Sequence, residues 1–274
     1  MTGSDAVVVV TGAGGMGCAV AHRIGIGTTV ILADCDEQLL ETAAAALTKT
    51  GFNVVSLVVD VSRKDSVEAL AADAAARGSV TAVVHTAGVS PVQAPVEAIM
   101  RVDLLGTALM LDAFGDVISR GGAGVFISSM AGTMASLDPD VELRLATTPT
   151  DQLLELGELS ADAISDSGTA YAVAKRANQV RVRAASLSWG KRGARVNSLS
   201  PGIISTPMGA AELDGPHGEI MRAMIEASGT GRIGTPDDIA GAVDFLIGND
   251  AGFITGTDLL VDGGVIAALR NPPS

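Results

Sequence analysis

Seven short runs of apolar residues, mostly Val, Ile and Leu, alternate along the chain with longer Ala-rich stretches of helical character. The runs lie at residues 6–10, 28–33, 53–59, 80–84, 124–128, 194–200 and 258–261. Strands that alternate with helices in this way form repeated βαβ units, which build a parallel sheet covered by helices on both faces. Because no fixed-period repeat, linker or low-complexity tract divides the sequence, we expect residues 1–274 to form one α/β domain.

One stretch, residues 133–168, interrupts this alternation. It contains two prolines and a cluster of acidic residues where a short loop would usually join a strand to a helix. Within it, Thr148 resembles an N-cap, Pro149 a first helical residue and Asp151 a residue near the third position, and leucines follow at 153, 154 and 156. The stretch is predicted to be a helical insertion, and long segments of this kind usually serve as a lid or an interface.

Composition agrees with this fold and narrows the range of partners. Apolar residues make up 47% of the 274 residues, aromatic residues only 3%, and there are 33 glycines. Buried parallel strands packed against Ala-rich helices have such an aliphatic core. The formal net charge of −13 argues against nucleic acid and anionic membranes as partners, because both require a basic surface.

Nothing in the sequence indicates export or membrane insertion. The first residues show no basic segment ahead of an apolar one, and two cysteines, Cys18 and Cys35, do not indicate a disulfide framework. The longest uncharged stretches are broken by Gly, Pro or Thr well before they could span a bilayer. We therefore expect a cytoplasmic protein.

A glycine-rich loop follows the first predicted strand. Gly12, Gly14 and Gly17 form a GxGxxG pattern, and Met16 lies inside it. Such a loop allows a tight turn, brings the backbone close to a pyrophosphate and directs the N-terminus of a helix at the anion. In a glycine-rich chain the pattern is also compatible with an ordinary flexible turn, so the residues around it must distinguish a pyrophosphate-binding loop from such a turn.

The context is an acid at the end of the second predicted strand. Asp34 lies 17 positions after Gly17, where a carboxylate can accept the hydroxyl groups of an adenosine ribose. This carboxylate favours NAD over NADP, because a 2′-phosphate would meet like charge, and Asp36 and Glu37 reinforce the repulsion. The alternative is an exposed acid at a strand end without a ligand.

The only tyrosine of the chain, Tyr171, precedes Lys175 by four residues on a predicted helix, so both side chains lie on one face. A free phenol has a pKa of about 10, and bringing it near 7 requires roughly 4 kcal/mol. Two partly desolvated positive charges, an ammonium and an oxidised nicotinamide, could supply this, whereas one exposed lysine could not. The alternative is a half-buried tyrosine beside a solvated lysine.

Several motifs together resemble the short-chain dehydrogenase/reductase family over nearly the whole length. They are TGAGGMG (11–17), ISSMAG (127–132), YAVAK (171–175), VNSLSPGIISTPM (196–208), GRIGTPDDIAGAVDFL (231–246) and FITGTDLLVDGG (253–264). The resemblance implies a single Rossmann-type domain, doubly wound around a parallel sheet. It also implies hydride exchange between a nicotinamide and a secondary alcohol or ketone.

The resemblance assigns roles to individual residues. Tyr171 would be the general acid/base, Lys175 would lower its pKa and hold the nicotinamide ribose, and Ser129 would hydrogen-bond the substrate oxygen. Asp60 would contact the adenine. The other residues that the resemblance places along the cofactor are Val61, Ala87, Gly88, Pro201, Gly202, Ile204 and Thr206.

The sequence departs from the family pattern in several places. Its glycine loop is one residue shorter than the usual TGxxxGxG, and HTAG (85–88) replaces NNAG, which makes His85 a substitute for a structural Asn. Ser129 and Tyr171 are 42 positions apart, far more than is usual, so the insertion lies beside the active site. It is expected to shape the substrate pocket or to cover a helix face that relatives use for dimerisation.

A further departure is Asp103, in RVDLLGT (101–107), at the position of the family's helix asparagine. In the family, the main-chain carbonyl of that residue anchors a water leading from the lysine. An aspartate retains the carbonyl, so the relay can persist, and its carboxylate can add to it.

Methionines follow the serine and recur in the region that resembles the substrate loop: Met130, Met134, Met208, Met221 and Met224. They indicate an adaptable apolar pocket for a lipophilic, steroid-like alcohol or ketone, or they fill the core. Trp189, His22 and His217 have no metal-binding spacing, and no metal is expected.

Together these features predict an NAD-dependent alcohol/ketone oxidoreductase that acts on a small molecule and forms a homodimer or homotetramer. The alternative from another class is a dinucleotide-binding sensor or scaffold that has lost turnover, which Asp103 supports best and which Ser129, Tyr171 and Lys175 argue against. Epimerases and dehydratases of related folds fit the C-terminal motifs less well.

Overall fold

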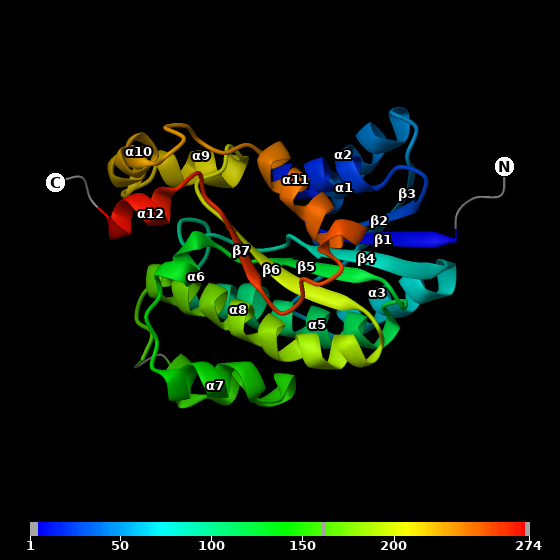
Figure 1. Cartoon of the computed structure of the whole chain (residues 1–274), viewed down its shortest axis with the longest axis horizontal. Helices are drawn as coiled ribbons and strands as arrows, with labels where there is room; N and C mark the ends of the chain where they lie inside the picture. The colour runs from blue at the N-terminus through cyan, green and yellow to red at the C-terminus, as the bar shows by residue number, and fades with distance from the viewer. Residues whose placement is uncertain (1–4, 161–162, 272–274) are drawn as a thin grey trace.

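The computed structural model describes residues 5–160 and 163–271, and at its centre is a sheet of seven parallel strands (Figure 1). The strands are β1 (Ala6–Thr11), β2 (Thr29–Asp34), β3 (Asn53–Val58), β4 (Ser79–His85), β5 (Ala123–Ile127), β6 (Arg195–Pro201) and β7 (Asp258–Val261). Each coincides with one of the predicted apolar runs. Their order across the sheet is β3-β2-β1-β4-β5-β6-β7. The predicted α/β, doubly wound, Rossmann-type architecture is thus confirmed.

Helices cover both faces of this sheet (Figure 1). On one face lie α1 (Gly15–Ile24), α2 (Glu37–Lys49) and α11 (Pro236–Ile247), and on the other lie α3 (Lys64–Arg77), α5 (Thr107–Val117) and α8 (Ser167–Lys191). The shorter elements are α4 (Val96–Ile99), the π-helix η1 (Met100–Gly106), α6 (Met130–Met134), α7 (Pro139–Thr147), the 3-10 helices η2 (Thr150–Glu155) and η3 (Gly157–Leu159), α9 (Pro207–Leu213), α10 (Gly218–Ala227), the 3-10 helix η4 (Asn249–Ala251) and α12 (Val265–Arg270).

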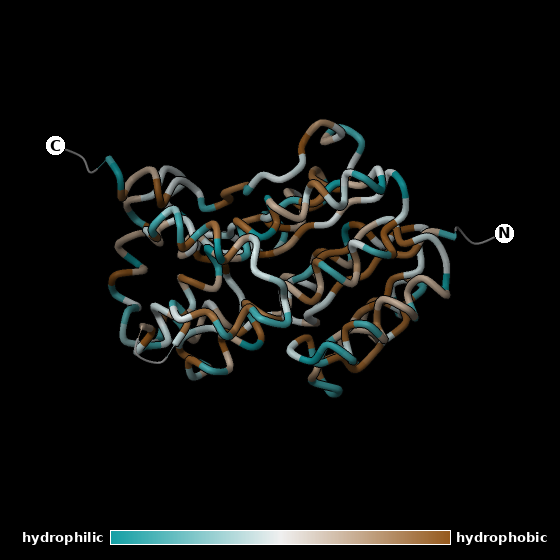
Figure 2. Tube along the Cα trace, turned by 90° about the horizontal axis from the view of Figure 1, so that it is seen from below, coloured by the Kyte–Doolittle hydropathy of each residue, from teal (hydrophilic) through white to brown (hydrophobic). Residues whose placement is uncertain are grey.

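The apolar run of β1 is continuous because both of its faces are buried. Val7 and Val9 pack with the helices of the α3 side, whereas Val8 and Val10 pack with those of the α1 side. Complete burial of each such side chain contributes roughly 1.5–3 kcal/mol. The helices, by contrast, alternate between hydrophobic and hydrophilic segments along their traces (Figure 2), as helices with one face on a sheet do.

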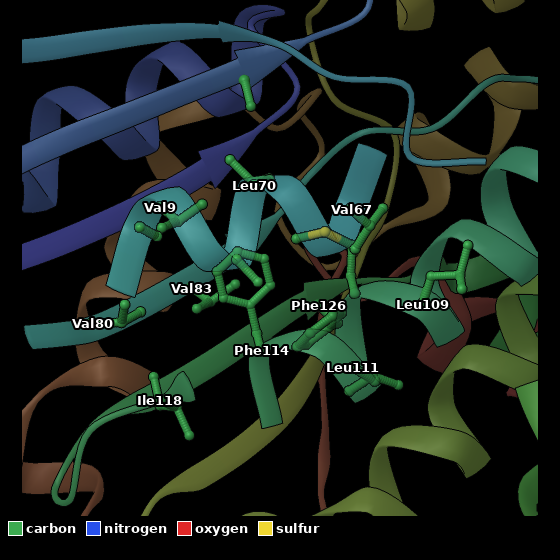
Figure 3. Close-up of a cluster of buried hydrophobic side chains, with 14 of the residues drawn as sticks. Val9, Val67, Leu70, Val80, Val83, Leu109, Leu111, Phe114, Ile118 and Phe126 are labelled. Atoms are coloured by element: carbon green, nitrogen blue, oxygen red, sulfur yellow. The ribbon is translucent and has the colours of Figure 1, made fainter. Parts of the chain in front are cut away.

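Three of the seven aromatic residues lie in the core of the α3 side. Phe114 of α5 and Phe126 of β5 lie among aliphatic side chains from α3, α5 and the central strands (Figure 3). Trp189 of α8 packs edge-on against Phe126, with ring centroids 6.1 Å apart, and its indole N–H donates to the Leu111 carbonyl. Trp189 is therefore a structural residue.

The insertion packs against the outer side of α8 (Figure 1). Apart from residues 161–162, which lie outside the described residues, it consists of α7, η2, η3 and connecting turns. Its buried residues Leu145, Leu153, Leu159 and Ile164 form a third apolar cluster with residues of η1 and α8. The predicted helical character of the stretch is thus seen in the structure.

The predicted start of the helix within the insertion was wrong. Thr148 is the C-cap of α7 and Pro149 the N-cap of η2, so the residues after Pro149 form a 3-10 helix. The α-helix begins earlier, because the Asp138 side chain accepts the backbone N–H of Asp140 and Pro139 occupies the first turn.

None of the helices in the described part of the chain is long and apolar enough to cross a membrane. In the same residues, no group of three or more His, Cys, Asp or Glu side chains is arranged to hold a metal ion.

Candidate active site

The predicted site residues gather at the carboxyl ends of the central strands, where the order of the sheet reverses between β1 and β4. In open α/β sheets this crevice is the usual place for a ligand. The glycine loop follows β1, Asp34 ends β2, the segment with Ala87 and Gly88 follows β4, and Ser129 follows β5.

The glycine loop packs tightly against its own backbone and against β4. Gly12 has φ 91°, and a Cβ there would lie 2.5 Å from Thr86 Oγ1 and 2.8 Å from the Ala87 nitrogen. A Cβ on Gly17 would lie within 1.8 Å of the Gly12 carbonyl oxygen. Both positions therefore require glycine.

Gly14, in contrast, has nothing within 4 Å of the place where a Cβ would be. It is the N-cap of α1, and no side chain caps this helix end. The first amides of α1 and its dipole are therefore available to an anion on an open side of the loop, which fits a pyrophosphate.

Asp34, at the end of β2, forms a hydrogen bond with the glycine loop. Its Oδ2 accepts the Ala13 N–H at 2.6 Å, and its Oδ1 accepts the Asp36 N–H at 2.9 Å. Each carboxylate oxygen retains a lone pair, and the side chain is only half-buried, so it remains able to accept ribose hydroxyl groups.

Asp60 and Val61, the two predicted cofactor residues that follow β3, lie in different environments. Asp60 is half-buried, and its Oδ1 accepts hydrogen bonds from the backbone and the hydroxyl group of Ser62. The Val61 side chain is buried in the core beside η1. Only the backbone of Val61 can therefore contribute to a cofactor site.

The segment after β6 lies against the glycine loop. A Cβ on Gly15 would lie 3.3 Å from Thr206 Cγ2. Thr206 is the N-cap of α9, and the Gly202 N–H donates to Val261. Together with Met16, four predicted residues of this segment line one cavity: Pro201, Gly202, Ile204 and Thr206.

Ser129 and Tyr171 line the same cavity. Ser129 is the N-cap of α6, where its Oγ accepts the Ala131 N–H at 3.1 Å. Tyr171 projects from the first turns of α8, whose N-cap, Asp166, accepts the Thr169 N–H. The adjacent Ser128 also borders the cavity but is buried, and it donates its hydroxyl hydrogen to the Lys175 carbonyl.

Lys175 lies one turn after Tyr171, with its Nζ 5.3 Å from the centre of the phenol ring. Burial raises the pKa of the Tyr171 phenol, and the charge of Asp103 raises it further. The charge of Lys175 and contact with the Ser129 hydroxyl lower this pKa without overcoming the other effects. The lysine alone therefore leaves the phenol protonated, so an additional positive charge is needed to ionise it.

Asp103 is fully buried on the π-helix η1, and its carboxylate meets the lysine directly. Its Oδ1 lies 3.3 Å from Lys175 Nζ and accepts the Val89 N–H at 3.1 Å. The main-chain carbonyl of Asp103 accepts hydrogen bonds from the Thr107 hydroxyl and the Asn178 amide. This geometry differs from the expected relay, in which that carbonyl would hold a water next to the lysine.

His85 is buried at the end of β4, and its Nδ1 lies 2.7 Å from the Thr11 hydroxyl oxygen. Burial and the neighbouring charge of Lys175 lower its pKa to about 3, so it is neutral at ordinary pH. Its position agrees with the predicted structural role.

The cavity has a volume of about 710 Å³ and a largely apolar lining. All five methionines singled out from the sequence, and Met16, line it, which favours the pocket interpretation over the alternative of core filling. Among its polar residues, Glu212 of α9 lies close enough to raise the pKa of Tyr171, and burial raises the pKa of Glu212 itself. The body of the insertion packs on α8, and among its described residues only those at its two ends, Met134 and residues 166–168, reach the cavity.

Two site residues were missed in the sequence. Asn178 lies three residues after Lys175 on the same face of α8, and this helical spacing could have identified it. Glu212 gives no such signal, because its position depends on how α9 folds over the cavity.

Comparisons with known proteins find similar sequences and structures over nearly the whole chain. A family model described as short chain dehydrogenase matches residues 6–138, and one described as enoyl-(acyl carrier protein) reductase matches residues 144–266. The short-chain dehydrogenase/reductase bsc3 of Alternaria brassicicola is 41% identical over 99% of both chains. D-threitol dehydrogenase of Mycolicibacterium smegmatis is 32% identical over 94% of this chain and 92% of its own. Among solved structures, levodione reductase has a TM-score of 0.78 and 26% identity, over 97% of this chain and 99% of its own.

Proposed function

This chain belongs to the short-chain dehydrogenase/reductase family, and from that premise we propose that it interconverts a secondary alcohol and a ketone with NAD(H). The family's enzymes are oxidoreductases that act on alcohols or ketones with a nicotinamide dinucleotide. The observation that carries the proposal is that Ser129 and Tyr171 line one cavity together with Met16 of the glycine loop, while Lys175 Nζ lies 5.3 Å from the centre of the Tyr171 ring.

In this proposal, Tyr171 exchanges a proton with the substrate oxygen. It donates the phenolic proton when a ketone is reduced and accepts the hydroxyl proton when an alcohol is oxidised. The Ser129 hydroxyl hydrogen-bonds the same oxygen and orients it. When bound, the nicotinamide donates or accepts the hydride, and its oxidised ring carries a positive charge.

The electrostatics of the site support a phenol that is active only when the cofactor is bound. Because burial outweighs the charge of Lys175, the pKa of Tyr171 is raised above that of a free phenol. A second positive charge favours the phenolate. Loss of the phenolic proton of Tyr171 would therefore be coupled to binding of the oxidised cofactor.

NAD is the proposed cofactor, and Asp34 is the reason for preferring it to NADP. Its carboxylate can accept both ribose hydroxyl groups, whereas a 2′-phosphate would meet like charge. Asp36 and Glu37 add to this repulsion, and residues 29–48 contain no Lys or Arg to offset it.

The proposed substrate is a lipophilic, steroid-like alcohol or ketone. Six methionines around a cavity of about 710 Å³ form an adaptable apolar surface of suitable size. The half-buried Glu212 can accept a hydrogen bond from a second hydroxyl group on such a molecule.

The experiment that tests the proposal measures NADH oxidation with a panel of cyclic and polycyclic ketones, for the native chain and for Tyr171→Phe. We expect turnover of at least one ketone, and a loss of kcat of about 10²–10⁴-fold in the variant while NADH still binds. NADH binding without turnover by the native chain would instead favour the sensor or scaffold.

A further inference from the structure

The ammonium of Lys175 has an unusual partner in this site. Its Nζ lies 3.3 Å from Asp103 Oδ1, and the two side chains are 6% and 0% exposed. The carboxylate gains only one further hydrogen bond, from the Val89 N–H, and within residues 5–160 and 163–271 its Oδ2 has no hydrogen-bond partner. The lysine is therefore the main group that stabilises a charge on Asp103.

The main-chain carbonyl of Asp103 does not contact the lysine but accepts hydrogen bonds from two other side chains. It accepts the Thr107 hydroxyl at 2.7 Å and the Asn178 amide at 2.9 Å, so both of its lone pairs are used. A carbonyl filled by two side chains has no lone pair left for a water beside the lysine. The polar path from Lys175 thus leads to the carboxylate.

Gly88 makes this contact possible. A Cβ at this position would lie 2.6 Å from Asp103 Oδ1 and 3.3 Å from Lys175 Nζ. Any other residue would press against both charged groups. The contact between Lys175 and Asp103 therefore depends on glycine at position 88 as well as on the carboxylate at position 103.

We propose that Asp103 is a positioning residue that partly neutralises Lys175 and thereby sets the pH range in which Tyr171 exchanges its proton. The inference rests on the proposed function of Tyr171. With an amide in place of the carboxylate, the phenol faces an uncompensated ammonium. With the carboxylate, it faces a pair whose charges largely cancel, so ionisation of the phenol requires a higher pH.

The other charges around the phenol are few. Of the described residues, those whose charge acts on Tyr171 are Lys175, Asp103 and, from α9, Glu212. His85 on β4 is neutral, because burial and Lys175 hold its pKa at about 3. Burial raises the pKa of Asp103, while Lys175 and the Val89 N–H oppose that rise and favour its charged form.

Because Tyr171 is the only tyrosine of the chain, its ionisation can be followed directly by the near-ultraviolet absorbance of the phenolate. The test titrates the native chain and Asp103→Asn with bound NAD. We expect the pKa of Tyr171 to fall by about one unit in the variant. Asp116→Asn removes the charge of an exposed acid on α5 and should leave this pKa unchanged.

The acid limb of kcat/KM for alcohol oxidation should move to lower pH by a similar amount in Asp103→Asn. If this variant fails to fold, as judged by circular dichroism, Asp103→Ala removes the same charge and is titrated instead. An unchanged pKa of Tyr171 in the folded variant would overturn the inference. Absence of turnover in the native chain would instead count against the proposed function, because the absorbance titration does not depend on activity.

Discussion

At the scale of the residue, the charges that act on the Tyr171 phenol come from both near and distant parts of the sequence. Tyr171 and Lys175 are a local pair, and their shared helix face was predicted from the sequence together with Ser129. The contact between Lys175 and Asp103 was not, because it depends on the π-helical register of η1 and on the space left by Gly88. The hydrogen bonds that the Asp103 carbonyl accepts from Thr107 and Asn178 were not predicted either, and the expected relay through that carbonyl stays a prediction.

A prediction at this scale concerns cofactor choice. Asp34→Asn keeps a side-chain oxygen for the Ala13 N–H but removes the charge that repels a 2′-phosphate. We expect the ratio of the Kd for NADPH to the Kd for NADH to fall about tenfold, equivalent to roughly 1.4 kcal/mol, as measured by the fluorescence of the bound nicotinamide. Asp116→Asn, which removes the charge of an exposed acid on α5, serves as the control. Tighter binding of NADPH than NADH by the native chain would contradict the role of Asp34.

At the scale of the element, the strands were predicted well and the insertion only in outline. Strands buried on both faces carry continuous Val-rich runs, and this signal is strong. The start of α7 was missed because Asp138 and Pro139 give a signal of the same kind as Thr148 and Pro149. Which of the two begins an α-helix is decided by packing of the insertion against α8.

Arg181 of α8 links the insertion to the rest of the fold by hydrogen bonds. Its guanidinium donates to the carbonyls of Leu145 and Thr148, at the end of α7, and to the Thr150 hydroxyl. Arg181→Met should lower the free energy of unfolding by about 2 kcal/mol, because these acceptors lose a charged donor. Urea unfolding followed by the fluorescence of Trp189, which lies on the same helix, measures the change. Arg183→Met, at an exposed position on α8, is the matched control, and equal stability of the two variants would contradict this role.

At the scale of the whole molecule, the insertion decides which surface remains available for self-association. It covers the outer side of α8 with its own leucines. That relatives use this face for dimerisation stays a prediction. Phe245 of α11 is 46% exposed and Phe253, just before β7, is fully exposed, so apolar surface remains beside the last strand.

We therefore expect a homodimer or homotetramer that forms through the side of the molecule carrying β7 and α11. Light scattering of the native chain should give a multiple of 27.5 kDa, and Phe253→Glu should shift the mass toward the monomer. Leu187→Glu, which changes an exposed leucine of α8, should leave the mass unaltered. A monomeric native chain, or dissociation by the α8 variant alone, would contradict this arrangement.

The central claim is that Lys175 and an oxidised nicotinamide together make the Tyr171 phenol acidic enough to exchange protons. Absorbance titration of this single tyrosine tests it most directly, with the protein saturated by NAD or by NADH. We predict that the pKa of Tyr171 lies about two units lower with NAD than with NADH, and that Lys175→Met raises it while Lys191→Met, at the exposed end of α8, does not. Equal pKa values with both cofactors, or no response to Lys175→Met, would contradict the claim.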